Sequence, residues 1–190
     1  MRLWVYLAIA LMSFSQFFLI NFIYDRHVFL IEPWRLWTAH WVHLSVWHWA
    51  LNVAALALLP EIFLRTSPRF FLLLWFTLPP LVSLMLYFFM PNLIQYAGLS
   101  GVLHGIYLAV ALSATQNSHA AERKMGWVVV LGVCAKVGWE AYSGNSQTAK
   151  LIGAPVVLQA HQYGAGLGFL IWLFLRLTPF YAAFIAKKSN

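Results

Sequence analysis

The sequence has 190 residues, of which 62% are hydrophobic, 17% are aromatic and only 9% are charged. A soluble domain carries roughly a quarter of its residues as charged side chains, and a disordered chain is poor in aromatic residues, so both classes are excluded. We therefore predict an all-α fold, a polytopic membrane protein with a single domain over residues 1–190, in keeping with its mean hydropathy of +0.74.

Six apolar segments follow one another along the chain, most of them close to the length that crosses a bilayer. The first begins after Arg2 and is too long for the apolar core of a signal peptide. No small-x-small cleavage motif precedes Asp25, so we expect a retained anchor. The third contains Pro79 and Pro80 and is expected to be kinked. The six predicted spans are residues 3–23, 44–64, 70–90, 98–114, 125–142 and 155–177.

Basic residues predict the orientation, because cytoplasmic loops of membrane proteins carry an excess of Lys and Arg. With the N-terminus inside, eight basic residues fall on the cytoplasmic side, three fall outside, and Lys136 lies in the fifth span. We therefore expect both termini inside (N-in/C-in). We interpret the net charge of +7 as part of this orientation signal. Because no run of Lys and Arg is longer than two residues, no nucleic acid partner is expected. The inner set is Arg2, Arg65, Arg69, Arg123, Lys124, Arg176, Lys187 and Lys188, and the outer set is Arg26, Arg35 and Lys150.

Residues 70–121 contain no Asp, Glu, Lys or Arg, although they span two predicted helices and the link between them. The fourth predicted helix is short, which leaves two alternatives. It begins below the membrane surface, with the link 91–97 dipping into the bilayer, or it is simply a short helix that follows a short loop. Irregular backbone at that depth requires surrounding protein or a water-filled cavity. The first alternative therefore predicts a cavity.

Polar side chains occur at one depth in three of the predicted spans. His48 and Asn52 share one face of the second span, because their spacing is one helical turn. Ser100 and His104 open the fourth span in the same way, and His161 lies in the outer half of the sixth. Polar groups within a membrane are costly and are functional hypotheses by default.

Acyl transfer is the chemistry that this set of residues can perform. Ser100 is a weak nucleophile that needs a base, which His161 can supply. His48 and the Asn52 amide can join the backbone N–H of Ser100 in stabilising an oxyanion at a helix N-terminus. Because no acidic residue is near His161 in the sequence, we expect a Ser-His dyad rather than a triad.

Each of these residues also has a purely structural interpretation. A single Ser or His in a membrane helix more often bonds to its own turn or to a neighbouring helix, and Gly164 with Gly168 forms a common helix-packing motif. Lys136 and Glu140, one turn apart, predict a structural ion pair, with a proton pathway as the alternative. His40, His43 and His48 lack the Cys pair, the HExxH motif or the nearby carboxylate of a metal site, so no metal and no cofactor is expected.

Together the motifs resemble the rhomboid family of intramembrane serine proteases. The resemblance covers residues 33–168 and implies a six-helix core with a cavity open to the outside. It also implies Ser100 as nucleophile, His161 as general base, and an oxyanion site of His48, Asn52 and the Ser100 amide, with Gly98, Gly101, His104 and Gly164 around them. The matching residues are Trp34-Arg35, His48-x-x-x-Asn52, Gly98-x-Ser100-Gly101 and Ala160-His161-x-x-Gly164.

Within that family the sequence is most similar to the rhombosortase branch, through its compact form and the stretch 98–105. Many rhomboids carry Tyr four residues after the serine, where it packs on the histidine; here His104 replaces it, which puts that packing in question. The branch implies a bacterial inner (cytoplasmic) membrane, an active site on the periplasmic side, and transmembrane substrates ending in Gly-Gly, a hydrophobic helix and a basic tail. The acyl acceptor, water or another nucleophile, is left open. The alternative function is a non-catalytic pseudoprotease that binds membrane segments.

Overall fold

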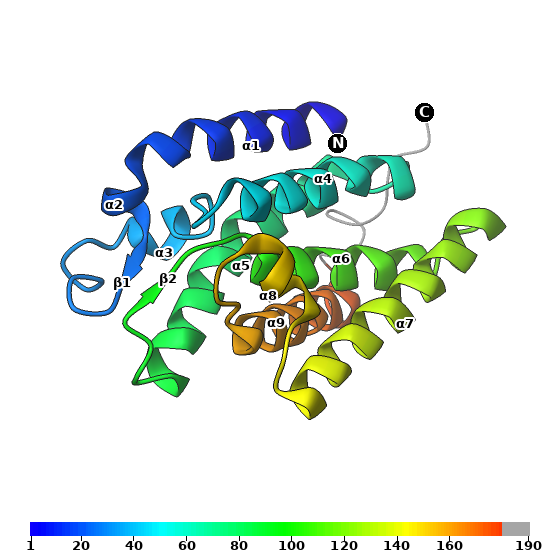
Figure 1. Ribbon diagram of the computed structural model, residues 1–190. Helices are drawn as coiled ribbons and strands as arrows, with labels where there is room; N and C mark the ends of the chain where they lie inside the picture. The colour runs from blue at the N-terminus through cyan, green and yellow to red at the C-terminus, as the bar shows by residue number, and fades with distance from the viewer. Residues whose placement is uncertain (180–190) are drawn as a thin grey trace.

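The computed structural model describes residues 1–179, apart from the side chain of Gln147, and is mostly helical (Figure 1). Two of the predicted inner basic residues, Lys187 and Lys188, lie outside the described residues. Helices occur at each of the six predicted segments, joined by shorter elements. The elements in chain order are α1 (Arg2–Ser15), the 3-10 turn η1 (Gln16–Phe18), α2 (Leu19–Phe22), β1 (Tyr24–Asp25), α3 (Arg35–Thr38), α4 (Val46–Ile62), α5 (Pro68–Phe89), β2 (Gln95–Tyr96), α6 (Ser100–Ala114), α7 (Ala120–Ser143), α8 (Gln147–Ile152) and α9 (Leu158–Leu177).

The first apolar segment differs from the single continuous helix that was expected, since the 3-10 turn divides it after Ser15. The Gln16 side chain accounts for the division. Its amide nitrogen donates to the carbonyl oxygens of Met12 (2.9 Å) and Trp41 (2.7 Å), and its amide oxygen accepts from the backbone N–H of His43 (2.9 Å). The turn therefore fastens α1 to the segment that leads into α4.

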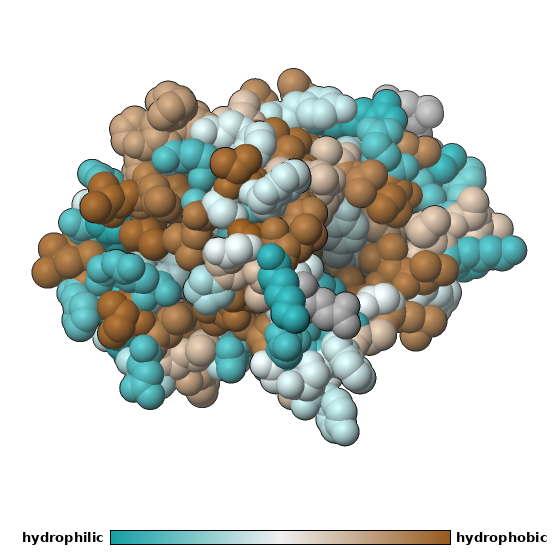
Figure 2. Space-filling model, viewed as in Figure 1, coloured by the Kyte–Doolittle hydropathy of each residue, from teal (hydrophilic) through white to brown (hydrophobic). Residues whose placement is uncertain are grey.

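Two of the described helical segments, Arg2–Phe22 and Pro68–Phe89, are long and apolar enough to cross a membrane, and α4 and α6 are shorter apolar helices. Large apolar side chains are also widely exposed, among them Phe17 (84%), Ile20 (82%) and Val46 (75%). Brown, hydrophobic side chains accordingly cover much of the face shown in Figure 2. A surface this apolar is suited to lipid rather than to water.

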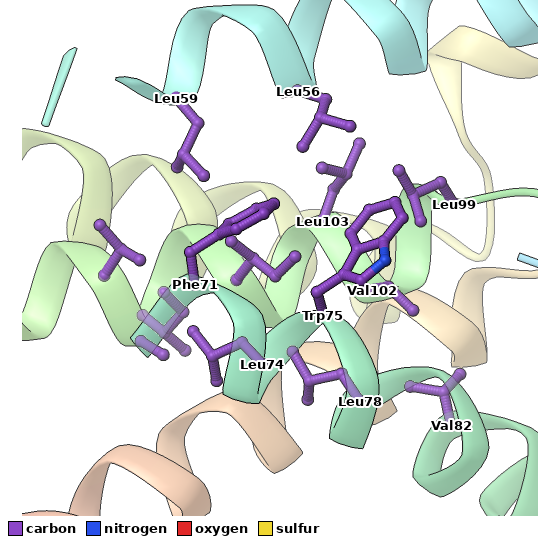
Figure 3. Close-up of a cluster of buried hydrophobic side chains, with 14 of the residues drawn as sticks. Leu56, Leu59, Phe71, Leu74, Trp75, Leu78, Val82, Leu99, Val102 and Leu103 are labelled. Atoms are coloured by element: carbon purple, nitrogen blue, oxygen red, sulfur yellow. The ribbon is translucent and has the colours of Figure 1, made fainter. Parts of the chain in front are cut away.

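The interior lies between α4, α5 and α6 (Figure 3). Leu56 and Leu59 of α4 point toward Phe71 and Trp75 of α5, and side chains at the start of α6, such as Leu103, complete the cluster. Each of these five residues is almost fully buried. α5 continues through its two internal prolines, Pro79 and Pro80, to Phe89.

Ion pairs join the helix ends at the end of the molecule that the sequence assigns to the cytoplasm. Arg2 at the start of α1 binds Glu61 near the end of α4 through two bonds of 2.9 and 2.8 Å. Arg65, which follows α4, lies 3.4 Å from Glu122 in the first turn of α7. Basic residues from two parts of the chain, Arg2 and Arg65, therefore lie at this end of the helices.

Helices α6 and α9 approach so closely that their backbones touch, and glycine makes this approach possible. A Cβ atom on Gly101 would lie 2.7 Å from the carbonyl oxygen of Ala160, and one on Gly105 would lie 2.5 Å from that of Gly164. Gly164 and Gly168 face the backbones of Gly101 and Gly105 in return. This is the close packing that small residues allow between membrane helices, and it brings the first turns of both helices together.

Candidate active site

Ser100 and His161 meet at the start of these two packed helices. The Oγ of Ser100 and the Nε2 of His161 are 2.9 Å apart, within hydrogen-bond distance. Ser100 is the first residue of α6, so its backbone N–H has no acceptor within that helix and lies at the positive end of the helix dipole. His161 is 2% exposed. A serine with a neighbouring base at a helix N-terminus can act as an activated nucleophile.

The second ring nitrogen of His161 binds a carboxylate, which the sequence reasoning did not expect. His161 Nδ1 lies 2.7 Å from Glu140 Oε2, near the end of α7. A carboxylate only accepts hydrogen bonds, so the proton lies on Nδ1 and Nε2 is free to accept from the Ser100 hydroxyl. The expectation that no acidic residue reaches His161 is therefore wrong, because Glu140 is distant in sequence and adjacent in space.

The other oxygen of Glu140 is held separately. Lys136 Nζ donates to Oε1 at 2.5 Å, which confirms the predicted ion pair, and the Ser146 hydroxyl donates to the same oxygen at 3.2 Å. Ser146 lies just before α8 and also bonds to Thr148 (2.6 Å). Each carboxylate oxygen thus has its own partners, and the group is fixed in orientation.

His48 and Asn52 are the site residues contributed by α4. The Ser45 hydroxyl caps this helix by accepting from the His48 N–H (3.1 Å), and Asn52 Nδ2 donates to the carbonyl oxygen of His48 (3.1 Å). That bond uses one of the two amide protons of Asn52 and leaves the other available. Both residues are buried and line the same cavity as Ser100.

Gly98 determines how closely His48 approaches the start of α6. Its φ of +129° is one that residues with a side chain rarely adopt. A Cβ atom at this position would lie 2.5 Å from His48 Cε1. The Gly98 N–H donates to the carbonyl oxygen of Ala39 (3.0 Å), and its own carbonyl accepts from the Tyr96 hydroxyl (2.7 Å). Gly98, two residues before the start of α6, is therefore held in place through both its N–H and its carbonyl group.

His104 lies one turn below Ser100 and stacks on His161, with ring centroids 4.2 Å apart and an angle of 20° between the planes. Its Nδ1–H donates to the Ser100 carbonyl oxygen at 2.7 Å. The sequence left this packing in question because an imidazole replaces the usual aromatic ring. In the structure the imidazole provides the stacking and adds a bond to the serine backbone.

A cavity of about 270 Å³ connects these groups. Its wall comes from α4, α6, α7, α8 and the first turn of α9, and Figure 2 shows a hollow in the face between α4 and α7. Most of its lining surface is apolar, and its polar groups come from several of these helices. The lining includes His48, Asn52, Ser100, His104, Tyr107, Lys136, Thr148 and His161. A mostly apolar cavity with convergent polar groups is typical of a binding site.

His104, Glu140 and His161 also present ligand atoms within 4.8 Å of one another, a spacing that could hold a divalent cation. Hydrogen bonds already account for the geometry of the three side chains, since both nitrogens of His161 and both oxygens of Glu140 have protein partners. This set also differs from His40, His43 and His48, the residues that the sequence analysis considered for a metal site. His40 Nε2 lies 3.0 Å from the Ser83 hydroxyl instead.

The structure brings together every residue that the sequence predicts for the site. Ser100, His161, His48 and Asn52 line one cavity, and the predicted neighbouring residues Gly98, Gly101, His104 and Gly164 pack around them. The sequence reasoning missed the contact of Glu140 with His161. The available signal was the position of Glu140 near the outer end of its predicted span, level with Ser100 and His161.

The chain matches the family model of the Rhomboid domain over residues 31–177. The match contains α3 to α9 and therefore every residue of the site described above. Comparison with curated protein sequences gave no match.

Proposed function

Because the chain belongs to the rhomboid family, a family of helical membrane proteins that are typically serine proteases, we propose that it is an intramembrane serine protease with Ser100 as nucleophile and His161 as general base. The observation that carries the proposal is the 2.9 Å contact between Ser100 Oγ and His161 Nε2 at the N-terminus of α6. The carboxylate on Nδ1 fixes the tautomer that this role needs.

The proposed reaction begins when Ser100 Oγ attacks a substrate carbonyl carbon while its proton passes to His161 Nε2. The carbonyl oxygen becomes an oxyanion, stabilised by the Ser100 N–H and by the polar groups of His48 and Asn52. His161 then gives its proton to the leaving nitrogen as the peptide bond breaks. Water or another nucleophile, activated by the same imidazole, then attacks the acyl-enzyme carbonyl carbon and releases Ser100.

The cavity supports a substrate that enters from the membrane. Its wall is mainly apolar and lies between helices that also expose large apolar side chains, such as Leu58 on α4 (53%) and Leu131 on α7 (65%). A hydrophobic substrate segment can therefore remain in an apolar environment as it approaches Ser100. We place the cavity on the periplasmic side of a bacterial inner membrane, with six spans and both termini in the cytoplasm. The basic residues at the opposite end of the helices support this orientation.

The substrate class that we propose follows the rhombosortase branch: exported proteins that end in Gly-Gly, a hydrophobic helix and a basic tail. A segment with small residues at the cleavage position suits this site, because backbone has to enter the narrow space between His48 and Ser100. Cleavage there would release the exported protein from its own membrane anchor.

The test uses two reporter proteins that carry such a tail, one with Gly-Gly and one with Val-Val at the same position, produced together with the wild type or with Ser100→Ala. We expect the wild type to cut the Gly-Gly reporter and Ser100→Ala to cut neither. A fluorophosphonate probe is used in parallel, because it reports an activated serine without any substrate. Probe labelling without reporter cleavage would refute the substrate class, and cleavage that persists in Ser100→Ala would refute the mechanism. A wild type that is neither labelled nor active would favour the pseudoprotease that binds membrane segments.

A further inference from the structure

We propose that Glu140 is a positioning residue of the catalytic group, so that the protein works with a Ser100–His161–Glu140 triad in place of a serine–histidine dyad. This inference rests on the proposed protease function. The inference goes beyond that function because it makes the catalytic rate depend on α7, a helix that supplies neither the nucleophile nor the base.

The contact between Glu140 and His161 has the geometry and the burial of a strong hydrogen bond. The atoms are 2.7 Å apart, and the two side chains are only 5% and 3% exposed. A charged acceptor makes such a bond roughly twice as strong as a neutral one, and few water molecules can compete for it. The bond therefore fixes both the ring orientation and the tautomer of His161.

The surroundings of Glu140 keep its carboxylate ionised and prevent its rotation. Lys136 compensates the negative charge from one turn away on the same helix, and Ser146 donates to the same oxygen. Oε2 is thereby left to His161. The Lys136 side chain is 40% exposed and lines the catalytic cavity. Water in the cavity can therefore solvate the ammonium group of the Lys136–Glu140 pair.

The packing of α7 provides the strongest alternative, which is a purely structural role. The inner half of this helix is held against α6 at Gly126, where a Cβ atom would lie 2.8 Å from the Ala111 carbonyl oxygen. Beyond Val130, Glu140 is the only buried residue of the helix. Glu140 could therefore serve as a tether that keeps the outer half of α7 in place, and the experiment has to distinguish a tether from a partner in catalysis.

The two roles differ in the step that they affect. When Ser100 Oγ bonds to the carbonyl carbon, its proton moves to Nε2 and the electron pair of the C=O double bond moves to the oxygen. The imidazole becomes an imidazolium beside Glu140, whose negative charge stabilises it. A positioning residue lowers the barrier to this step, whereas a tether affects folding and the shape of the cavity.

Glu140→Gln separates the roles because an amide has one accepting and one donating end. Lys136 and Ser146 both donate, so they select the amide oxygen and turn the NH₂ group toward His161. That group donates to Nδ1, places the ring proton on Nε2 and removes the acceptor for the Ser100 hydroxyl. A tether is retained in this variant, since the bonds to Lys136, Ser146 and His161 all persist.

The experiment measures the rate constant of inactivation by a fluorophosphonate, its saturation constant and the thermal unfolding temperature, all in detergent micelles. We expect Glu140→Gln to lower the rate constant by roughly 100-fold or more, with the saturation constant and unfolding temperature close to those of the wild type. Glu140→Asp should recover part of the rate, because it restores the charge. Glu122→Gln is the matched control: it removes a buried carboxylate from the same helix, about 27 Å along its axis, and should keep the wild-type rate.

A Glu140→Gln variant that is folded and labelled at the wild-type rate would overturn the triad and establish the tether. The proposed function would be unaffected by that result, provided that labelling still requires Ser100 and His161. If the variants do not fold, proton NMR of the wild type with ¹⁵N-labelled histidine decides. A far-downfield Nδ1–H resonance of His161 that shifts when the fluorophosphonate reacts with Ser100 supports the triad, because the bond then responds to the reaction, and a resonance that is absent or unchanged refutes it.

Discussion

Replacement of Gly101 by alanine tests the geometric basis of the site, because this glycine sets the distance between α6 and α9. A Cβ atom here would lie 2.7 Å from the Ala160 carbonyl oxygen, and ordinary van der Waals contact begins at 3.4 Å. The contacting atoms are backbone, so relief requires the helices to separate by about 0.7 Å. That displacement would lengthen the 2.9 Å contact between Ser100 and His161 to about 3.6 Å, beyond hydrogen-bond range.

The expected result is a loss of both activity and stability. Overpacking of this kind costs about 1–3 kcal/mol, and misplacement of reacting groups by about an ångström can cost 100-fold in rate. Gly166→Ala is the matched control, because Gly166 lies on α9 and a Cβ atom there would meet nothing within 4 Å. Fluorophosphonate labelling rates and thermal unfolding in detergent measure the two effects.

The reasoning would be refuted by a Gly101→Ala variant that unfolds at the temperature of the Gly166→Ala variant and is labelled at the same rate. Such a result would mean that α6 and α9 can separate without moving Ser100 away from His161. A loss of stability with full labelling would show that the strain is relieved elsewhere along the helices, and would equally contradict the argument.

Substitutions at four further residues test other parts of the structure. Asn52→Ala should lower the rate constant for reporter cleavage by roughly 100-fold if its amide stabilises the oxyanion, and an unchanged rate constant would remove it from that role. His104→Phe should retain most labelling while His104→Ala loses more, because the stacked ring supports His161; equal losses would refute the stacking role. Arg35→Ala should lower the unfolding free energy by about 2 kcal/mol or more, since Arg35 is buried and bonds to Glu32 and to two backbone carbonyls. Arg2→Ala, which breaks an exposed pair, should cost less than about 1 kcal/mol by the same denaturation assay.

Sequence reasoning was effective for the helices and for the residues near the ends of helices. Apolar length locates a membrane helix with no knowledge of the fold, and a helix lies at each predicted segment. The depth of a residue along its helix follows from the same argument. His48, Ser100 and His161 could therefore be assigned to one level of the membrane, and they line one cavity.

Rotation about each helix axis could not be predicted in the same way, and the missed contact depends on it. Glu140 was correctly paired with Lys136, because that inference uses only positions along one helix. Which neighbour it faces depends on the packing of α7 against α6 and α9. That packing is set by close contacts at Gly126 and by the glycines of α6 and α9, which apolar periodicity does not encode when helices are apolar on most sides.

The interruption of the first helix has a similar origin. Residues 3–23 are uniformly apolar apart from a few polar side chains, so composition predicts one helix. The 3-10 turn depends on Gln16, whose amide binds the backbone at Trp41 and His43, about 25 residues later in the chain. A local pattern cannot reveal that partner.

The scarcity of charge gives the proposed triad a further physical justification. A lone carboxylate in the outer half of a membrane helix would be costly, and Lys136 compensates it at 2.5 Å. In the proposed reaction the resting site holds one negative and one positive charge, on Glu140 and Lys136. The transition state adds a negative oxyanion and a positive imidazolium, so the net charge stays at zero throughout. A net charge is strongly destabilised in a cavity with a low dielectric constant. With Lys136 present, the Glu140 carboxylate can stabilise the imidazolium of His161 while the site as a whole stays neutral.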